Sequence, residues 1–168
     1  MKKFELIAEK SIEWCGIKLF RIRALISFGT VTAGDEGGYV EKERNVDMSG
    51  NAWVSGDARV YGNAWVSGDA RVSGDAWVYG DARVYGNARV YGNAQLLWMT
   101  KVGGEFGTLT AFRNKDGGVT ITRGCFIGSI DEFRTAVIEK HGGTLHEKGY
   151  LGLANYIEWH FSELHPIV

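Results

Sequence analysis

The chain has 168 residues, of which 45% are hydrophobic and 23% charged, so it is long enough for one folded domain with small additions and too apolar to be disordered. Its net charge of −1 argues against nucleic-acid binding, which needs a basic surface. No stretch resembles a signal peptide or a membrane span, and Cys15 and Cys125 stand far apart, so we expect a reduced, cytoplasmic protein without membrane contacts.

Residues 1–37 are predicted to form a small β-strand cap. From Phe20 to Phe28, apolar residues occupy every second position, which is typical of a strand with one buried face. Residues 4–8 alternate more weakly and are expected to pair with that strand across a turn at residues 14–16. Gly34 to Gly38 then leads into a repeat.

The repeat has a period of six residues, in the form Gly-Asn/Asp-Ala-x-Val-x. The valines stand at Val54, Val60, Val66, Val72, Val78, Val84 and Val90, with Met48 before them and Leu96 after them in the same register. Six is not a multiple of 3.6, so a helix would scatter these side chains, whereas in a strand the small residue and the valine point the same way. Gly and Asn or Asp suit sharp corners. Each hexad is therefore predicted to be a short strand and a corner.

Residues 38–98 thus resemble the hexapeptide-repeat, left-handed parallel β-helix family, in which three hexads make one triangular coil of eighteen residues. The resemblance implies a mainly β fold with somewhat less than three coils between Val46 and Leu97. Because the ends of such a coil expose a core and strand edges, we expect the flanking segments to cap it.

The flanks carry a second resemblance. The stretches LFRIRAL, AGDEGGYVEKERNV and DGGVTITRGCFIGSIDEF are similar to a widespread family of prophage-encoded proteins of unknown function. This resemblance implies a phage accessory protein that acts in the host cytoplasm, and it carries no catalytic residue with it.

Residues 99–168 are predicted to form a β-hairpin and two helices, a ββαα tail. Residues 108–113 and 119–123 flank the turn sequence NKDGG. Ser129 and Glu132 match a capping box at the start of the first helix, and Gly142 matches the left-handed residue after its end. The second helix is expected over residues 147–164.

Stacking by eighteen residues predicts columns of outward side chains on the coil. Trp53, Arg71 and Arg89 form one column, Arg59, Trp77 and Gln95 a second, and Asp47, Trp65 and Arg83 a third. Tyrosines follow the valines, and Tyr61, Tyr79 and Leu97 share the face of Trp77. Two interpretations stay open: cation–π pairs that stiffen the coil, or a recognition surface. The candidate binding residues are Trp53, Arg59, Tyr61, Trp65, Arg71, Trp77, Tyr79, Arg83, Tyr85, Arg89 and Tyr91.

This surface favours a non-enzymatic platform for protein binding and self-assembly. We expect a homo-oligomer, a trimer or a dimer, through the face of Tyr61, Trp77, Tyr79 and Leu97, and then a host or phage protein partner, with the blocking of a host defence factor as one role. A small-ligand sponge for nucleotides is an alternative.

An acyltransferase of the hexapeptide type is the enzymatic alternative. It needs a histidine as general base, and all four histidines, His141, His146, His160 and His165, lie in the tail. His141 or His146 would then be the base. No pattern indicates a catalytic residue, a cofactor or a metal site. Stacked corner aspartates such as Asp57 and Asp75 are expected to be turn formers, and Cys125 is expected to be a packed residue. Arg21, Arg23 and Arg123 are expected to be solvated, with an anionic groove between head and tail strands as the alternative.

Overall fold

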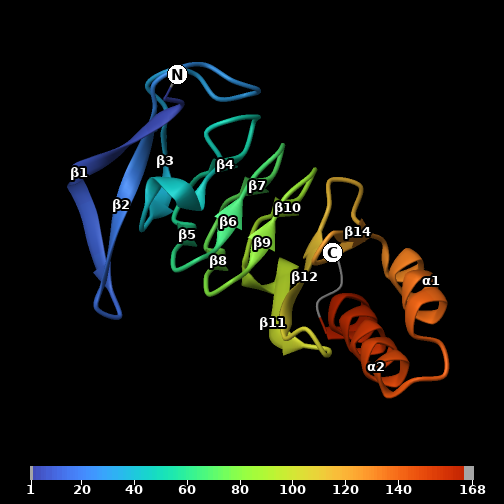
Figure 1. Ribbon diagram of the computed structural model, residues 1–168. Helices are drawn as coiled ribbons and strands as arrows, with labels where there is room; N and C mark the ends of the chain where they lie inside the picture. Colours follow the sequence, from blue (N-terminus) through green and yellow to red (C-terminus); the bar gives the residue numbers. More distant parts are fainter. Residues whose placement is uncertain (1, 165–168) are drawn as a thin grey trace. The chain divides into compact units, whose positions relative to one another are not determined.

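The computed structural model describes residues 2–164 of the chain, except for the side chain of Ala94. The chain divides into two compact units, a first that ends at Asn93 and a second that begins at Ala94. Figure 1 shows the N-terminal strands in blue at the start of a stack of short parallel strands, which make up the first unit. The second unit combines a small sheet with two helices.

The first unit opens with an antiparallel hairpin of β1 (Phe4–Trp14) and β2 (Ile17–Ala24), as the alternation predicted. Its turn places Cys15 and Gly16 in the left-handed region. β2 ends at Ala24, not at Phe28, because its last amide bonds to Asp35 and its last carbonyl accepts from Gly34, which turns the chain toward β3 (Glu36–Val40). β3 pairs with β2 and begins the coil.

The repeat forms seven strands of two residues each, spaced six residues apart along the chain. They are β4 (Trp53–Val54), β5 (Arg59–Val60), β6 (Trp65–Val66), β7 (Arg71–Val72), β8 (Trp77–Val78), β9 (Arg83–Val84) and β10 (Arg89–Val90). Strands eighteen residues apart pair in parallel and give three faces, β4–β7–β10, β5–β8 and β6–β9. The alanines and valines of all seven hexads are buried, as predicted.

The glycine corners explain why the coil can be so tight. The corner glycines from Gly50 to Gly86 have φ between 63° and 70°, a region that side chains disfavour. They also stack closely: a Cβ on Gly68 would lie 3.1 Å from the Gly86 nitrogen. The repeated glycine is therefore required both by its backbone angle and by the neighbouring coil.

The first coil departs from the predicted register. Val46, not Met48, is buried and bridges to Val66, twenty residues away, and Val40 pairs with Val60 at the same spacing. The shift arises at the 3₁₀ turn η1 (Glu43–Asn45), whose buried Asn45 amide donates to the Ala64 and Gly62 carbonyls. Asp47 consequently does not stack beneath Trp65, and that part of the third predicted column is wrong.

The N-terminal edge of the coil is closed by the preceding residues. β3 covers β5, and the amides of Tyr39 and Glu41 donate to the Ala58 and Val60 carbonyls. On the β4 face no described strand precedes β4, and the buried Lys3 ammonium instead donates to the Ala52 carbonyl oxygen at 3.0 Å. Burial lowers the pKa of Lys3, as does nearby Arg71, and Asp47 opposes that shift.

The coil ends one hexad earlier than predicted. The Trp77 amide donates to the Asn93 side chain at 2.7 Å, and the Asn93 amide group donates back to the Asp75 carbonyl. Gly92 also lacks the left-handed φ of the corners. Gln95 lies in the 3₁₀ turn η2 (Asn93–Gln95), and Leu97 pairs with Ala111. The predicted places of Gln95 and Leu97 in the columns are therefore wrong.

The second unit holds four antiparallel strands, not two. β11 (Leu96–Val102), β12 (Gly107–Arg113), β13 (Val119–Arg123) and β14 (Phe126–Gly128) lie side by side in chain order. The hairpin of β12 and β13 around the NKDGG turn is confirmed. The ββαα prediction missed β11, whose first residues were assigned to the repeat, and β14, which is only three residues long.

Two helices follow, α1 (Ile130–His141) and α2 (Leu145–Trp159), and α2 continues as the π-helical turn η3 (His160–Leu164). The capping box of Ser129 and Glu132 is confirmed. Gly142 is the C-cap with φ of −48°, and the left-handed residue is Gly143 instead. Buried residues of both helices and of the sheet form one core: Val102, Leu109, Ala111, Ile121, Phe133, Val137, Tyr150, Ala154, Ile157 and Phe161.

Candidate functional site

The outward side chains of the coil form the predicted columns where the eighteen-residue register holds. Trp53 stands beside Arg71 and then Arg89, Arg59 beside Trp77, and Trp65 beside Arg83. In two of these pairs the guanidinium lies over the indole, at 5.4 Å for Arg59 on Trp77 and 5.9 Å for Arg83 on Trp65. These two pairs therefore have cation–π geometry, and neither interpretation of the columns is decided by it.

The N-terminal segment covers part of this outward surface. Trp53 points out of the coil but is only 4% exposed, because Phe28 and Phe4 pack edge-on against its ring at 5.5 and 6.3 Å. Gly37 also lies against the Trp53 ring, so that a Cβ there would meet it at 2.7 Å. Trp53 therefore belongs to the interior of the first unit, and its predicted place on a binding surface is wrong.

The face that the sequence singled out for assembly is also partly occupied. Trp14, at the tip of the β1–β2 hairpin, packs 4.8 Å from Trp77 and lies 4.2 Å from the Arg59 guanidinium. Beside them Tyr61 and Tyr79 stack face to face at 5.1 Å. Burial raises the pKa of Tyr61, and the neighbouring Tyr79 adds to the shift. Trp77 is half-buried here, whereas Tyr79 keeps 39% of its surface exposed.

The most exposed predicted residues are spread over all three faces, and Tyr79 on the β5–β8 face is one of them. Trp65 is 36% exposed beside exposed Arg83 on the β6–β9 face, with half-buried Tyr85 next to them in the sequence pattern. On the β4–β7–β10 face Tyr91 is 56% exposed. Of the candidate binding residues predicted from the sequence, only four are exposed in the structure: Trp65, Tyr79, Arg83 and Tyr91. We call these four residues the outward aromatic surface.

A shallow hollow of about 570 Å³ lies on the β4–β7–β10 face, between the coil and the loop that precedes β3. Arg71, Arg89 and Tyr91 line it, together with Asp35 and Glu36. Burial and the neighbouring Arg89 lower the pKa of Arg71. Arg89 is held in place by donating to the Asp69 and Ala88 carbonyls, each at 2.9 Å.

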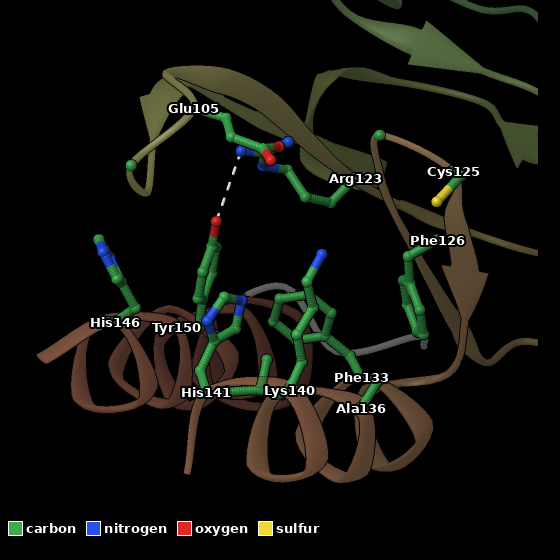
Figure 2. Close-up of a pocket in the computed structure, with 13 residues that line it drawn as sticks. Glu105, Arg123, Cys125, Phe126, Phe133, Ala136, Lys140, His141, His146 and Tyr150 are labelled. Carbon is green, nitrogen blue, oxygen red and sulfur yellow. Dashed lines mark hydrogen bonds between the residues drawn. The ribbon is translucent and has the colours of Figure 1, made fainter. Parts of the chain in front are cut away.

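The second unit contains a cavity of similar volume that sequence reasoning missed, and we call it the C-terminal pocket. It measures about 560 Å³, and its lining residues come from the β11–β12 turn, the β13–β14 turn and both helices: Gly104, Glu105, Arg123, Gly124, Cys125, Phe126, Phe133, Ala136, Val137, Lys140, His141, His146 and Tyr150. Figure 2 shows Arg123 and Glu105 on one side of it, opposite His141, Lys140 and Tyr150. The glycine-rich sequence GGEFG, from Gly103 to Gly107, is the signal that could have indicated the pocket, because its glycines let this turn lie close to the helices.

The structure places the remaining candidates as follows. His141 and His146, the two possible bases, both line the C-terminal pocket with ring centroids 5.8 Å apart, while His160 is buried in η3 and His165 lies outside the described residues. Cys125 is exposed, contrary to its expected packed position. Arg21 and Arg23 belong to the first unit and Arg123 to the second. Arg21 donates to the Gly37 and Gly56 carbonyls, so it has a structural role.

Residues 2–164 contain no group of three His, Cys, Asp or Glu side chains placed to hold a metal ion. Two pairs of stacked corners are instead joined by hydrogen bonds, from Asn51 to Asp69 at 2.8 Å and from Asn63 to Asp81 at 3.2 Å. An amide above a carboxylate removes the repulsion that two stacked carboxylates would have.

Comparison with known proteins supports the repeat. The family model for the YdcK beta solenoid repeat matches residues 52–68, 64–80 and 82–97. Matching the curated proteins one by one gave no similar sequence. The chain is therefore a mainly β protein that contains a β-solenoid repeat, with helices in its C-terminal part. None of the described helices has the length and apolar character needed to cross a membrane.

Proposed function

We propose that the protein is a non-enzymatic β-solenoid platform that assembles with copies of itself and binds a protein partner through the outward aromatic surface. The observation that carries this proposal is that Trp65 in β6, Tyr79 directly after β8 and Tyr91 directly after β10 stay 36%, 39% and 56% exposed, next to strands held by parallel pairing. Trp, Tyr and Arg are the residues that most often dominate the binding energy of interfaces. A rigid coil also presents them without losing backbone freedom on binding.

Self-association through the β6–β9 face is the first form of this proposal. Trp65 and Arg83 lie there in register, and the backbone next to them stays paired, because the Ser67 amide donates to the Val84 carbonyl at 3.0 Å. The Tyr61–Tyr79 face is the weaker choice, because Trp14 already packs on Trp77 within it. The oligomer is then a dimer or a trimer of an 18.5 kDa chain.

Native mass measurement tests this form directly. We expect the wild-type chain to have a mass of two or three times 18.5 kDa and Trp65→Ala to be shifted toward the monomer. Loss of an interface tryptophan that contributes about 2 kcal/mol weakens association about 30-fold. Trp159→Ala is the matched control, because Trp159 is 47% exposed on α2 in the second unit. A wild-type monomer at high concentration, or equal losses in both variants, contradicts self-assembly through Trp65.

The finer identity of the fold and its setting are part of the same proposal. We infer that the coil winds left-handed as a hexapeptide helix, which its three faces and eighteen-residue spacing support. We also infer a phage accessory role in the host cytoplasm, supported by the resemblance of the flanking segments to prophage-encoded proteins. If the partner is a defence factor, expressing this protein in a host that restricts phage should raise the number of phage plaques. The Trp65→Ala variant should not raise it. Unchanged plaque numbers across a panel of restricting hosts contradict this role.

A nucleotide sponge is a second candidate, favoured by the hollow beside Arg71, Arg89 and Tyr91. It predicts that nucleotides raise the melting temperature in proportion to the logarithm of their concentration, and that Arg89→Met abolishes the rise. An unchanged melting temperature at millimolar nucleotide contradicts it. The acyltransferase alternative predicts acetyl-CoA binding that is lost in His141→Gln or His146→Gln.

A further inference from the structure

We propose that the C-terminal pocket binds a small organic anion in which a phosphate or carboxylate group is joined to a flat apolar ring. The pocket lies wholly within the second unit, so the inference does not depend on the coil or its outward aromatic surface. Charge, an unmatched hydrogen-bond donor and a wall of aromatic rings support it separately.

The charges lining the pocket favour an anion. Arg123 and Lys140 are permanent cations at neutral pH, and Glu105 is the only carboxylate among the lining residues. Neither cation forms an ion pair with a side chain in the described part of the chain. The lining imidazoles of His141 and His146 add further hydrogen-bonding groups. A ligand anion would therefore meet two cations and one like charge.

Arg123 gives the second observation. Its Nη2 donates to the Val102 carbonyl at 2.8 Å and to the Tyr150 hydroxyl at 3.4 Å, so the guanidinium is fixed at the pocket wall (Figure 2). Its Nε is buried and has no hydrogen-bond acceptor among residues 2–164. A buried donor without an acceptor is costly, whereas bonds from arginine to carboxylate or phosphate are among the strongest in proteins. A guanidinium held at the pocket wall is therefore suited to an oxyanion.

The opposite wall is aromatic and suits a ring. Phe126 and Phe133 pack edge-to-face at 5.3 Å, and Phe133 and Tyr150 do so at 6.0 Å. The His141 ring lies 5.4 Å from Tyr150. A cavity of about 560 Å³ is much larger than a bare oxyanion needs and falls within the usual range of small-molecule sites. The ring of the ligand would pack against the apolar wall, and its oxyanion would face Arg123 and Lys140.

Glycines in the β11–β12 turn make this arrangement possible. A Cβ on Gly103 would overlap the Tyr150 hydroxyl, and one on Gly107 would overlap the Arg123 guanidinium. Gly103 also has φ of 68°, which favours glycine. The turn can therefore lie directly against the two side chains that place the donor, and the pocket has a fixed shape before a ligand arrives.

The test is a titration of the full chain with phenyl phosphate, followed by calorimetry and by NMR of labelled protein. Inorganic phosphate and phenol carry the two halves of the probe separately, and benzoate replaces phosphate by carboxylate. We expect phenyl phosphate or benzoate to bind at least about tenfold more tightly than either half, and the tighter of the two identifies the headgroup. Shifts should concentrate at Arg123, Lys140 and Tyr150.

Two variants separate the pocket from general charge effects. Lys140→Met combined with His146→Gln removes exposed pocket donors without touching the core, and we expect it to bind the probe about tenfold more weakly. Lys148→Met removes an equally exposed lysine that does not line the pocket and should bind as the wild type does. Three results would overturn the proposal: no binding at millimolar probe, equal loss in both variants, or shifts centred on Arg89 and Tyr91. If the chain still oligomerises through Trp65 in any of these cases, the platform proposal stands.

Discussion

Replacing Trp53 by alanine should destabilise the first unit strongly, whereas the same change at Trp65 should not. Both tryptophans occupy the same position of their hexads, and the sequence predicts that both point outward from the coil. In the structure Trp53 is 4% exposed beneath Phe4 and Phe28, and Trp65 is 36% exposed beside Arg83. The two substitutions therefore differ in environment and not in chemistry.

The magnitudes follow from this difference. A buried tryptophan removes on the order of 200 Å² from water, which at about 25 cal/mol per Å² gives an upper value near 5 kcal/mol. Measured losses for buried Trp→Ala are about 3–5 kcal/mol, because a cavity remains. At Trp65 solvent fills the space, and the main loss is a cation–π pair of about 0.5–1 kcal/mol. We therefore expect the free energies of unfolding of the two variants to differ by about 2–4 kcal/mol.

Urea unfolding followed by circular dichroism measures this difference without relying on tryptophan fluorescence. With a slope of about 2 kcal/mol per molar, the midpoint for Trp53→Ala should lie about 1–2 M below that for Trp65→Ala. Midpoints within about 0.3 M of each other would refute the buried placement of Trp53. If Trp53→Ala lost assembly but kept its stability, Trp53 would belong to the binding surface and not to the interior.

Further predictions concern single backbone and cap positions. Gly74→Ala should cost several kcal/mol of stability or prevent folding, because the φ of Gly74 is 65° and the new Cβ would overlap the Tyr91 carbonyl. In Gly152→Ala the new Cβ on α2 meets no atom within 4 Å, so this variant should be more stable by about 0.5–1 kcal/mol. Thermal unfolding of the two variants compares these effects. Ser129→Ala should cost about 1 kcal/mol through loss of the cap on α1, and an unchanged helical melting temperature would contradict this. Hydrogen bonds with the Ser129 backbone and side chain lower the pKa of Glu132. The stability that the ionised Glu132 contributes is therefore present above its ordinary pKa of 4.5 and is lost as the pH falls below that value. A Ser129→Ala variant, which lacks the side-chain bond, should lose less stability on acidification than the wild type.

The sequence predicted the repeat well because the repeat is local. Period six, the glycine corners and the alternation of alanine and valine settle the pairing from Val54 to Val90 without distant contacts. At the first coil this logic failed, because the register there is set by the Asn45 side chain, which bonds to carbonyls seventeen and nineteen residues away. A shift of two residues keeps the same face buried, so the hydrophobic pattern could not reveal it.

The candidate sites were predicted less well, for a similar reason. Whether Trp53 faces solvent depends on Phe4, 49 residues earlier, and whether Trp77 does depends on the hairpin tip at Trp14. The C-terminal pocket joins two turns and two helices, and none of its charged residues forms a motif in the sequence. The cluster of glycines at residues 103–107 could have indicated a close approach of the chain, but not what lies opposite it.

The most direct test of the solenoid, on which the platform proposal depends, is a map of amide and methyl contacts by nuclear Overhauser spectroscopy. Parallel coils predict contacts between residues eighteen apart, such as Val54 with Val72, Val60 with Val78 and Val66 with Val84, at the strand spacing of about 4.8 Å. Contacts that instead join valines six residues apart in antiparallel register, or the i,i+3 contacts of a helix, would contradict the coil and with it the columns of outward side chains.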